Sequence, residues 1–170
     1  MSEPTSSVPS VGIKSVIDKP LSDGPVGIGG WLILPILGLI LTPVITVFSV
    51  KDYLDLWNVR GFLTNFQVAF FAVEFIANIL ILVAAPVLLL WLLSKKLEIF
   101  PALYIIWICA QPAFIFLDSL AGLWVLGDLI SVEDAFDKDT KKSIAQGIGQ
   151  AVLWTLYINR SRRVENTFVN

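Results

Sequence analysis

The sequence predicts an all-α membrane protein: a four-helix transmembrane bundle with both ends in the cytoplasm and a disordered N-terminal tail. Hydrophobic residues make up 56% of the 170 residues, and the mean hydropathy is +0.78. Charged residues make up 15% and gather between a few long apolar runs. Only Glu74 and Asp118 lie well inside such a run. This segregation is typical of helices that cross a bilayer.

The first 28 residues differ in composition from the rest. They contain six serines, four prolines and three glycines, with few large apolar side chains. Such a segment cannot bury enough surface to offset its ordering entropy, so residues 1–28 are expected to form a flexible cytoplasmic tail. A secretory signal is not expected, because no basic start is followed at once by an apolar stretch. The transmembrane domain is expected over residues 29–168.

The first span is expected at about 31–50. At 1.5 Å per residue it is roughly 30 Å long, which matches a hydrocarbon core. Pro35 and Pro43 are expected to kink it. The segment that follows, 50–62, has apolar residues at helical spacing and polar residues on its other faces. This pattern predicts a short helix on the membrane surface.

Two further apolar runs predict the second and third spans. The second, at about 67–93, is longer than a bilayer requires, so it is expected to tilt, to bend near Pro86 or to protrude from the bilayer. The third, at about 101–126, ends before an acidic stretch that begins at Asp128. Both runs are long enough to cross the hydrocarbon core.

A fourth span is expected at about 143–159. Its length of roughly 25 Å is short for the core, and it contains Gln146 and Gln150. A helix lying in the membrane interface is therefore the alternative interpretation. A span is preferred because basic residues stand at both ends of the segment.

Two of the expected spans carry a small residue at every fourth position. Such a face lets another helix approach closely. Its occurrence in the first and fourth spans predicts that these two spans pack together. The residues are Gly38, Thr42 and Thr46 in the first span and Gly147, Ala151 and Thr155 in the fourth.

Lysines and arginines favour a cytoplasmic location of both ends. In that orientation seven of the twelve lie on the cytoplasmic side and five on the other, in agreement with the positive-inside rule. The cytoplasmic set is Lys14, Lys19, Lys95, Lys96, Arg160, Arg162 and Arg163, and the outer set is Lys51, Arg60, Lys138, Lys141 and Lys142.

Two motifs flank the apolar runs. The opening GIGGWLILPILGLILTP and the closing SRRVENTFV resemble the bacterial membrane proteins grouped as the DUF2569 family, over roughly residues 27–169. The resemblance implies four spans and a bacterial inner-membrane location. Because that family is a domain of unknown function, it implies no catalytic residue.

Composition disfavours most enzyme designs. The chain has no histidine, which removes Ser-His and Cys-His nucleophiles and histidine metal sites. The single cysteine, Cys109, lies in an apolar run and cannot form an intramolecular disulfide. With a net charge of -2 and no basic run, no nucleic-acid partner is expected. We therefore expect no enzyme activity, no catalytic residue, no metal and no cofactor.

The acidic segment 131–142 invites a calcium-binding interpretation. An EF-hand loop counted from Asp137 has Lys142 where glycine is needed and Ile148 where glutamate is needed. A solvated surface helix capped by Ser131 is the better interpretation. By the same argument Thr140 is expected to cap the fourth span.

Glu74 and Asp118 are the costly residues of the expected spans, because a charge at a helix centre costs roughly 2.5–3.5 kcal/mol or more. Both are expected roughly 10–12 Å below the outer boundary. Asn78 lies one turn from Glu74, and Gln111 lies on the face of Asp118. The spacing predicts a polar seam of these four residues. Two carboxylates in contact there would share a proton, or one would stay neutral.

Two interpretations of this seam are open. It holds helices together by hydrogen bonds, or it binds a cation or relays protons. Two functions follow. The first is an accessory or scaffold protein that binds the lipid bilayer, other membrane proteins or itself. The second is a proton- or cation-coupled transporter or channel component.

Overall fold

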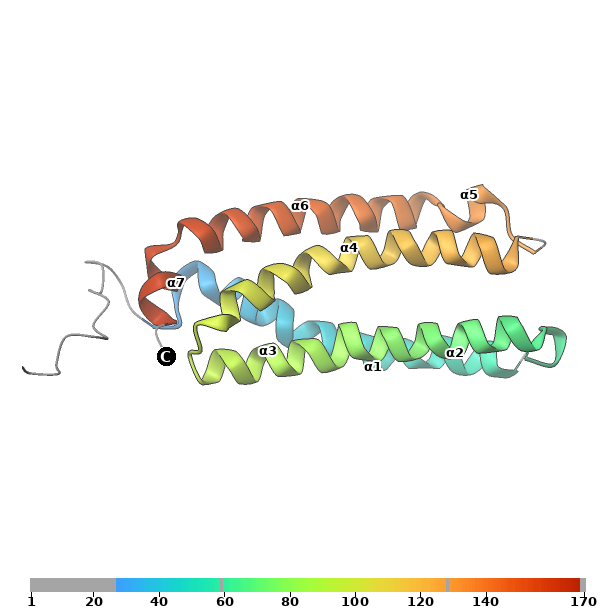
Figure 1. Ribbon diagram of the computed structural model, residues 1–170, viewed down its shortest axis with the longest axis horizontal. Helices are drawn as coiled ribbons and strands as arrows, with labels where there is room; N and C mark the ends of the chain where they lie inside the picture. Colours follow the sequence, from blue (N-terminus) through green and yellow to red (C-terminus); the bar gives the residue numbers. More distant parts are fainter. Residues whose placement is uncertain (1–26, 59, 128, 169–170) are drawn as a thin grey trace, which may run out of the picture.

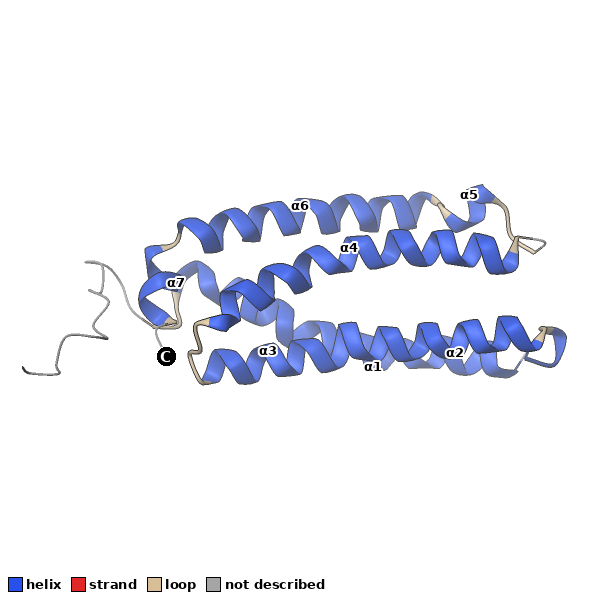
Figure 2. Ribbon diagram, in the orientation of Figure 1, coloured by secondary structure: helices blue, strands red, loops and turns tan. Residues whose placement is uncertain are grey.

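The structure, a computed structural model, describes residues 27–58, 60–127 and 129–168, and every regular element within them is helical (Figure 2). The predicted all-α class is confirmed for this part of the chain. The predicted tail lies outside it, apart from Gly27 and Ile28. The elements are the short helix η1 (Gly30–Leu32), α1 (Ile33–Asn58), η2 (Arg60–Phe62), α2 (Asn65–Ile79), the π-helical turn η3 (Leu80–Ala84), α3 (Ala85–Ser94), α4 (Ile99–Leu126), α5 (Val132–Ala135), α6 (Lys138–Arg160) and α7 (Arg162–Thr167).

Three helical segments of the described chain are long and apolar enough to cross a membrane. They are Gly30–Phe48, Asn65–Ser94 and Ile99–Leu126, and they coincide with the first three predicted spans. The second comprises α2, η3 and α3. It begins at Asn65 because Thr64 and Gln67 form a capping box, in which each side chain accepts a hydrogen bond from the other residue's backbone N–H.

The segment after the first span does not form a separate surface helix. Instead α1 continues without a break to Asn58, so this prediction was wrong. The physical reason is that no glycine or proline stands between Pro43 and Gly61 to end the helix. Pro43 itself lies inside α1.

The fourth predicted span corresponds to α6, which lies beside α4 (Figure 1) and packs on it more extensively than on any other element. α6 is not among the three apolar segments, because polar residues such as Gln146 and Gln150 lower its hydropathy. Its N-cap is Asp137, whose Oδ1 accepts a 2.7 Å hydrogen bond from the backbone N–H of Thr140. The prediction that Thr140 caps this helix was therefore wrong.

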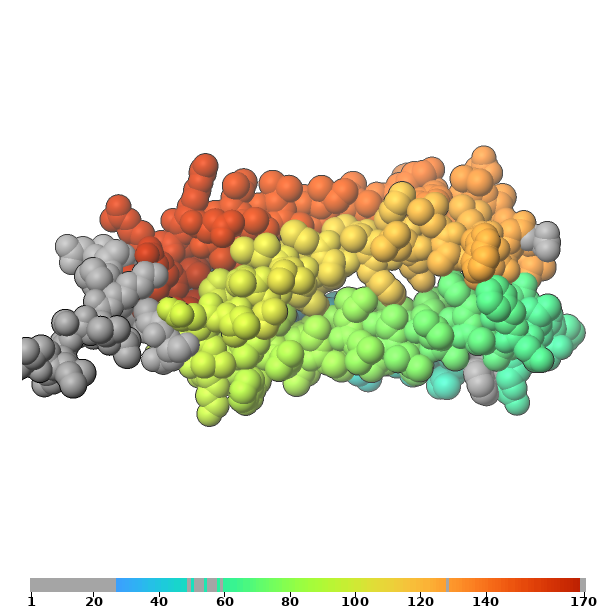
Figure 3. Space-filling view, in the orientation of Figure 1, coloured from blue at the N-terminus to red at the C-terminus, as the bar shows by residue number. Residues whose placement is uncertain are grey.

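The helices form two layers. α4 and α6 make one layer, and α1 with α2 and α3 makes the other (Figure 1). In the space-filling view α2 and α3 lie against α4 (Figure 3). Among the described residues the buried side chains gather in the half of the molecule that contains α7: they fall at 32–39, 86–112 and 151–168. This end is the packed core of the molecule.

The beginning and the end of the described chain meet at the packed end. The backbone N–H of Gly27 donates to Thr167 Oγ1 at 2.9 Å, and Thr167 Oγ1 donates to the carbonyl of Arg163 at 2.6 Å. Arg163 Nη1 in turn donates to the carbonyl of Gly27 at 3.5 Å. The two motifs that carry the family resemblance are therefore in direct contact.

Two features hold α7 in this position. Phe168 stacks on Phe100 of α4 with ring centroids 4.8 Å apart, and both rings are buried. The guanidinium of Arg163 lies against Gly29, where a Cβ would come within 3.0 Å of Nη1. Gly30 follows with a φ of +59°, in the left-handed region that favours glycine. The glycines thus let the chain turn into η1 beneath Arg163.

Candidate functional site

A small pocket, the seam pocket, lies between α2, η3 and α4. It has a volume of about 190 Å³. All four residues of the predicted polar seam line it: Glu74 and Asn78 from α2, and Gln111 and Asp118 from α4. Apolar side chains complete the lining, from Ile81, Leu82, Phe114 and Ile115. The structure therefore brings the predicted residues together, inside two of the apolar segments.

The two amides of the seam pocket differ in their hydrogen bonds. Asn78 Nδ2 donates to the carbonyl of Glu74 at 3.1 Å, so this side chain is held against its own helix. Gln111 Nε2 is buried and has no hydrogen-bond partner in the described part of the chain. A buried donor without a partner costs about 1–3 kcal/mol. Gln111 is therefore the residue of this pocket most in need of a further acceptor.

The π-helical turn η3 forms one wall of the seam pocket, and Pro86 explains it. Proline has no N–H, and its ring clashes with the carbonyl four residues earlier in an α-helix. The chain responds with a wider turn, in which the N–H of Ala85 bonds to the carbonyl of Leu80 instead of Ile81. Next to Pro86, where the sequence predicted a bend, the chain thus forms a π-turn, a feature frequent at functional sites.

The π-turn leaves the carbonyl of Ile81 without a backbone donor, because Ala85 bonds elsewhere and Pro86 has none to give. Trp107 of α4 supplies the missing donor: its Nε1 lies 2.8 Å from this oxygen. Trp107 is buried. The sequence did not predict this contact, because Pro86 signals a missing donor at the carbonyl four residues earlier, that of Leu82, and only the π-turn moves the missing donor to Ile81.

A larger pocket, the amide groove, lies between α1, α4 and α6, with a volume of about 660 Å³. Gln146 and Gln150 of α6 line it, with Gly149 between them, and all three are exposed. Gln111 lines both this groove and the seam pocket. α4 therefore presents one unsatisfied amide between two pockets.

Gly147, in the small face of α6, packs on α4, whereas the sequence predicted a contact of this face with the first span. A Cβ at Gly147 would lie 3.1 Å from Cβ of Pro112, and Ala151 is buried. A Cβ at Gly38 of α1 would meet nothing within 4 Å. The residues Gly38 and Thr42 instead line the amide groove. Helical spacing identified the small faces but did not identify their partners.

The threonine hydroxyls of the two small faces differ in their hydrogen bonds. Thr42 Oγ1 donates to the carbonyl of Gly38 at 2.8 Å, and Thr46 Oγ1 donates to the carbonyl of Thr42 at 2.9 Å. Both threonines are thus satisfied within α1. Thr155 Oγ1 on α6 is buried and has no partner in the described residues.

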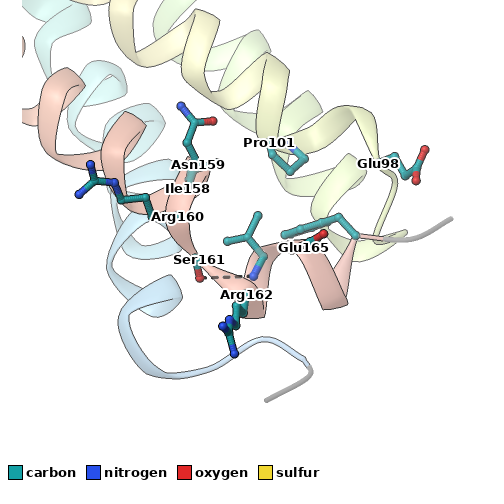
Figure 4. Close-up of a pocket in the computed structure, with 10 residues that line it drawn as sticks. Glu98, Pro101, Ile158, Asn159, Arg160, Ser161, Arg162 and Glu165 are labelled. Atoms are coloured by element: carbon teal, nitrogen blue, oxygen red, sulfur yellow. Dashed lines mark hydrogen bonds between the residues drawn. The ribbon is translucent and has the colours of Figure 1, made fainter. Parts of the chain in front are cut away.

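A third pocket, the end pocket, lies where α6 and α7 meet the start of α4, and has a volume of about 520 Å³ (Figure 4). Its charged lining residues are Glu98, Arg160, Arg162 and Glu165. In the sequence, the arginines served only to assign the orientation of the chain, and Glu98 was passed over. The available signal was an acidic residue directly before an apolar span.

The acidic segment before α6 uses its carboxylates as helix caps. Hydrogen bonds from the backbone N–H and the hydroxyl of Ser131, at 2.9 and 2.7 Å, lower the pKa of Asp134. The backbone N–H of Thr140 likewise lowers the pKa of Asp137. The predicted cap at Ser131 is confirmed. Across the described residues no group of three or more acidic or cysteine side chains is placed to hold a metal ion.

Comparison with known proteins identifies the family of this chain. A search of curated proteins and a search of solved structures each return none. The family model described as a protein of unknown function, DUF2569, matches residues 25–169. This range includes the seam pocket, the amide groove and both terminal motifs, and it covers most of the chain. The chain therefore belongs to the DUF2569 family.

Proposed function

We propose that this chain is an accessory or scaffold protein of the bacterial inner membrane, which binds other membrane proteins or a second copy of itself through the amide groove. The observation that carries the proposal is the buried Nε2 of Gln111, which has no partner in the described residues and lies in a groove bordered by exposed amides. This role requires no catalysis.

The membrane setting gives these amides their importance. Within a bilayer, polar groups are satisfied inside the protein or by a neighbouring helix, because lipid chains offer no hydrogen bonds. We take α6 to be a fourth span beside α4, with both ends of the chain in the cytoplasm. Gln146 and Gln150 then stand at membrane depth, and Gly149 between them lets a partner helix approach closely.

Cross-linking tests this proposal. A cysteine is placed at Gly149, where a Cβ meets nothing within 4 Å, in a chain whose exposed Cys109 is replaced by alanine. In native membranes, an oxidant reveals self-association by forming a disulfide between the new cysteines of two chains. A photocrosslinker attached to this cysteine through a maleimide reveals contacts with other proteins. We expect a discrete product in one of these two assays. Ile148→Cys, at an exposed position that does not line the groove, is the matched control.

A second substitution makes the test specific to the amides. Gln150→Leu, combined with Gly149→Cys, is expected to reduce the yield of the same product, since the partner loses a hydrogen-bonding group. Equal products from the groove and control positions, or a chain that stays monomeric in both assays, would refute the proposal.

The seam pocket favours a second candidate function, a proton- or cation-coupled transporter or channel component. Two acids and two amides line one pocket within apolar segments, and the π-turn η3 forms one of its walls. Acids inside a membrane mark candidate functional sites, and π-turns are frequent at such sites.

Proton flux into liposomes under an imposed gradient tests this second function. The transport function would be supported if the unmodified protein shows proton flux and if this flux disappears in the Glu74→Gln variant and in the Asp118→Asn variant. Glu133→Gln, which changes an exposed acid of α5, should leave any flux unchanged. Absence of flux in the unmodified protein would leave the accessory role alone.

A further inference from the structure

The end pocket lies at the boundary between an apolar segment and the polar end of the molecule. Glu98 directly precedes the apolar segment that begins at Ile99, and it is the N-cap residue of α4. On the opposite wall, α6 ends at Arg160 and α7 begins at Arg162. In a membrane this level is that of the lipid headgroups, where charged side chains are well tolerated.

Charged side chains reach this pocket from two sides: Arg160, Arg162 and Glu165 lie on α6 and α7, and Glu98 lies at the start of α4. Figure 4 shows Arg160 and Arg162 on one side and Glu98 on the other. Among the described residues, no hydrogen bond or ion pair engages these three side chains. The separation suits a ligand that carries a negative and a positive group a short distance apart. A purely anionic ligand would instead meet repulsion from Glu98.

Apolar surface connects this pocket with the membrane interior. Pro101, Ile158 and Phe168 contribute apolar lining. On α6, Leu156 and Val152 are exposed and lie one and two turns before the pocket residue Asn159. Residues at this spacing share a helix face. A ligand with a charged head in the pocket could therefore lay hydrocarbon chains along α6.

From these observations we infer that the end pocket is a binding site for a zwitterionic phospholipid with a primary ammonium, phosphatidylethanolamine. Arg160 and Arg162 bind its phosphate by charge-assisted hydrogen bonds, and the carboxylate of Glu98 accepts hydrogen bonds from its ammonium. The pocket volume of about 520 Å³ is within the common range for ligand sites, about 300–1,000 Å³. The inference is independent of the proposed function.

Native mass spectrometry of the delipidated full-length protein tests this site, with three added phospholipids that have identical acyl chains. Phosphatidylethanolamine is expected to bind about threefold to fivefold more tightly than phosphatidylcholine or phosphatidylglycerol, the effect of one exposed ion pair. Phosphatidylcholine has no ammonium N–H to donate, and phosphatidylglycerol has no cation. Equal affinity for the three lipids would overturn the assignment without any variant.

Variants then test which group of the lipid each side of the end pocket binds. Glu98→Gln is expected to lower the affinity for phosphatidylethanolamine to that for phosphatidylglycerol, whereas the double variant Arg160→Gln with Arg162→Gln should weaken both lipids. Lys142→Gln removes an exposed charge at the opposite end of α6 and should change neither affinity. The role of Glu98 would be contradicted if the Glu98→Gln variant had the same unfolding temperature as the unmodified protein and still bound phosphatidylethanolamine more tightly than the other two lipids.

Discussion

The indole nitrogen of Trp107 and the carbonyl oxygen of Ile81 join two apolar helical segments through a 2.8 Å hydrogen bond. Ile81 lines the seam pocket, and Trp107 lines the amide groove. The bond exists because Pro86 forces a π-turn that removes the backbone donor from Ile81. A single proline thus creates the contact that lies between the two candidate sites.

Trp107→Phe is expected to destabilise the protein by about 1–2 kcal/mol, because the ring is kept but the carbonyl of Ile81 loses its donor. Denaturant unfolding in detergent, followed by circular dichroism, measures the change. Trp91→Phe is the matched control, since the Trp91 side chain is half exposed. Equal effects of the two substitutions would show that the hydrogen bond contributes nothing.

Two glycine substitutions are expected to have opposite signs. Gly30→Ala should destabilise by about 1–2 kcal/mol, because Gly30 has a φ of +59° that an L-residue adopts at a cost. Gly38→Ala should stabilise by about 0.5–1 kcal/mol, because it lies within α1 and a Cβ there has open space. The same unfolding experiment measures both. A stabilising Gly30→Ala would contradict the described turn beneath Arg163.

Phe168→Ala is expected to release α7 from the packed end, with a loss of about 3 kcal/mol for a buried aromatic ring. Phe168 is 5% exposed and stacks on Phe100. Amide hydrogen exchange over residues 161–168 should rise in the variant. Phe62→Ala, at a ring that is 93% exposed, should leave exchange in this segment unchanged. Unaltered exchange after Phe168→Ala would mean that the stack does not hold α7.

The contribution of the α5 cap to stability is expected to depend on pH through Asp134. Its hydrogen bonds with Ser131 lower the pKa of Asp134 below the ordinary value of 3.8. A carboxyl with a lowered folded-state pKa stabilises the fold above its unfolded pKa, and this contribution is lost as the pH falls through the folded value. NMR titration should show the pKa of Asp134 rising in Ser131→Ala, while the pKa of Asp137, which is lowered by Thr140, stays constant. No rise at Asp134 would rule out the cap.

Sequence patterns predicted the face and depth of the polar residues on each helix, and so the seam between two helices, but missed contacts whose partner no pattern specifies. Helical spacing placed Glu74 with Asn78 and Gln111 with Asp118, and apolar length indicated the segments that carry them. The partner of Gly147 was not predictable in this way, because a small face fits any helix that approaches it, and the structure pairs it with Pro112. Likewise Pro86 predicts a bend but does not identify Trp107 as the donor that stabilises it.

The acids of the seam pocket provide the last prediction. Glu74 and Asp118 line one small pocket with mostly apolar walls, and two carboxylates close together in low dielectric do not both ionise. An infrared carboxylic-acid band is therefore expected at neutral pH. Glu74→Gln and Asp118→Asn should each remove or shift this band, whereas Glu133→Gln, at an exposed position of α5, should not. A band unaffected by both seam variants would mean that the two acids do not share a proton, and the seam would then act only by holding α2 against α4.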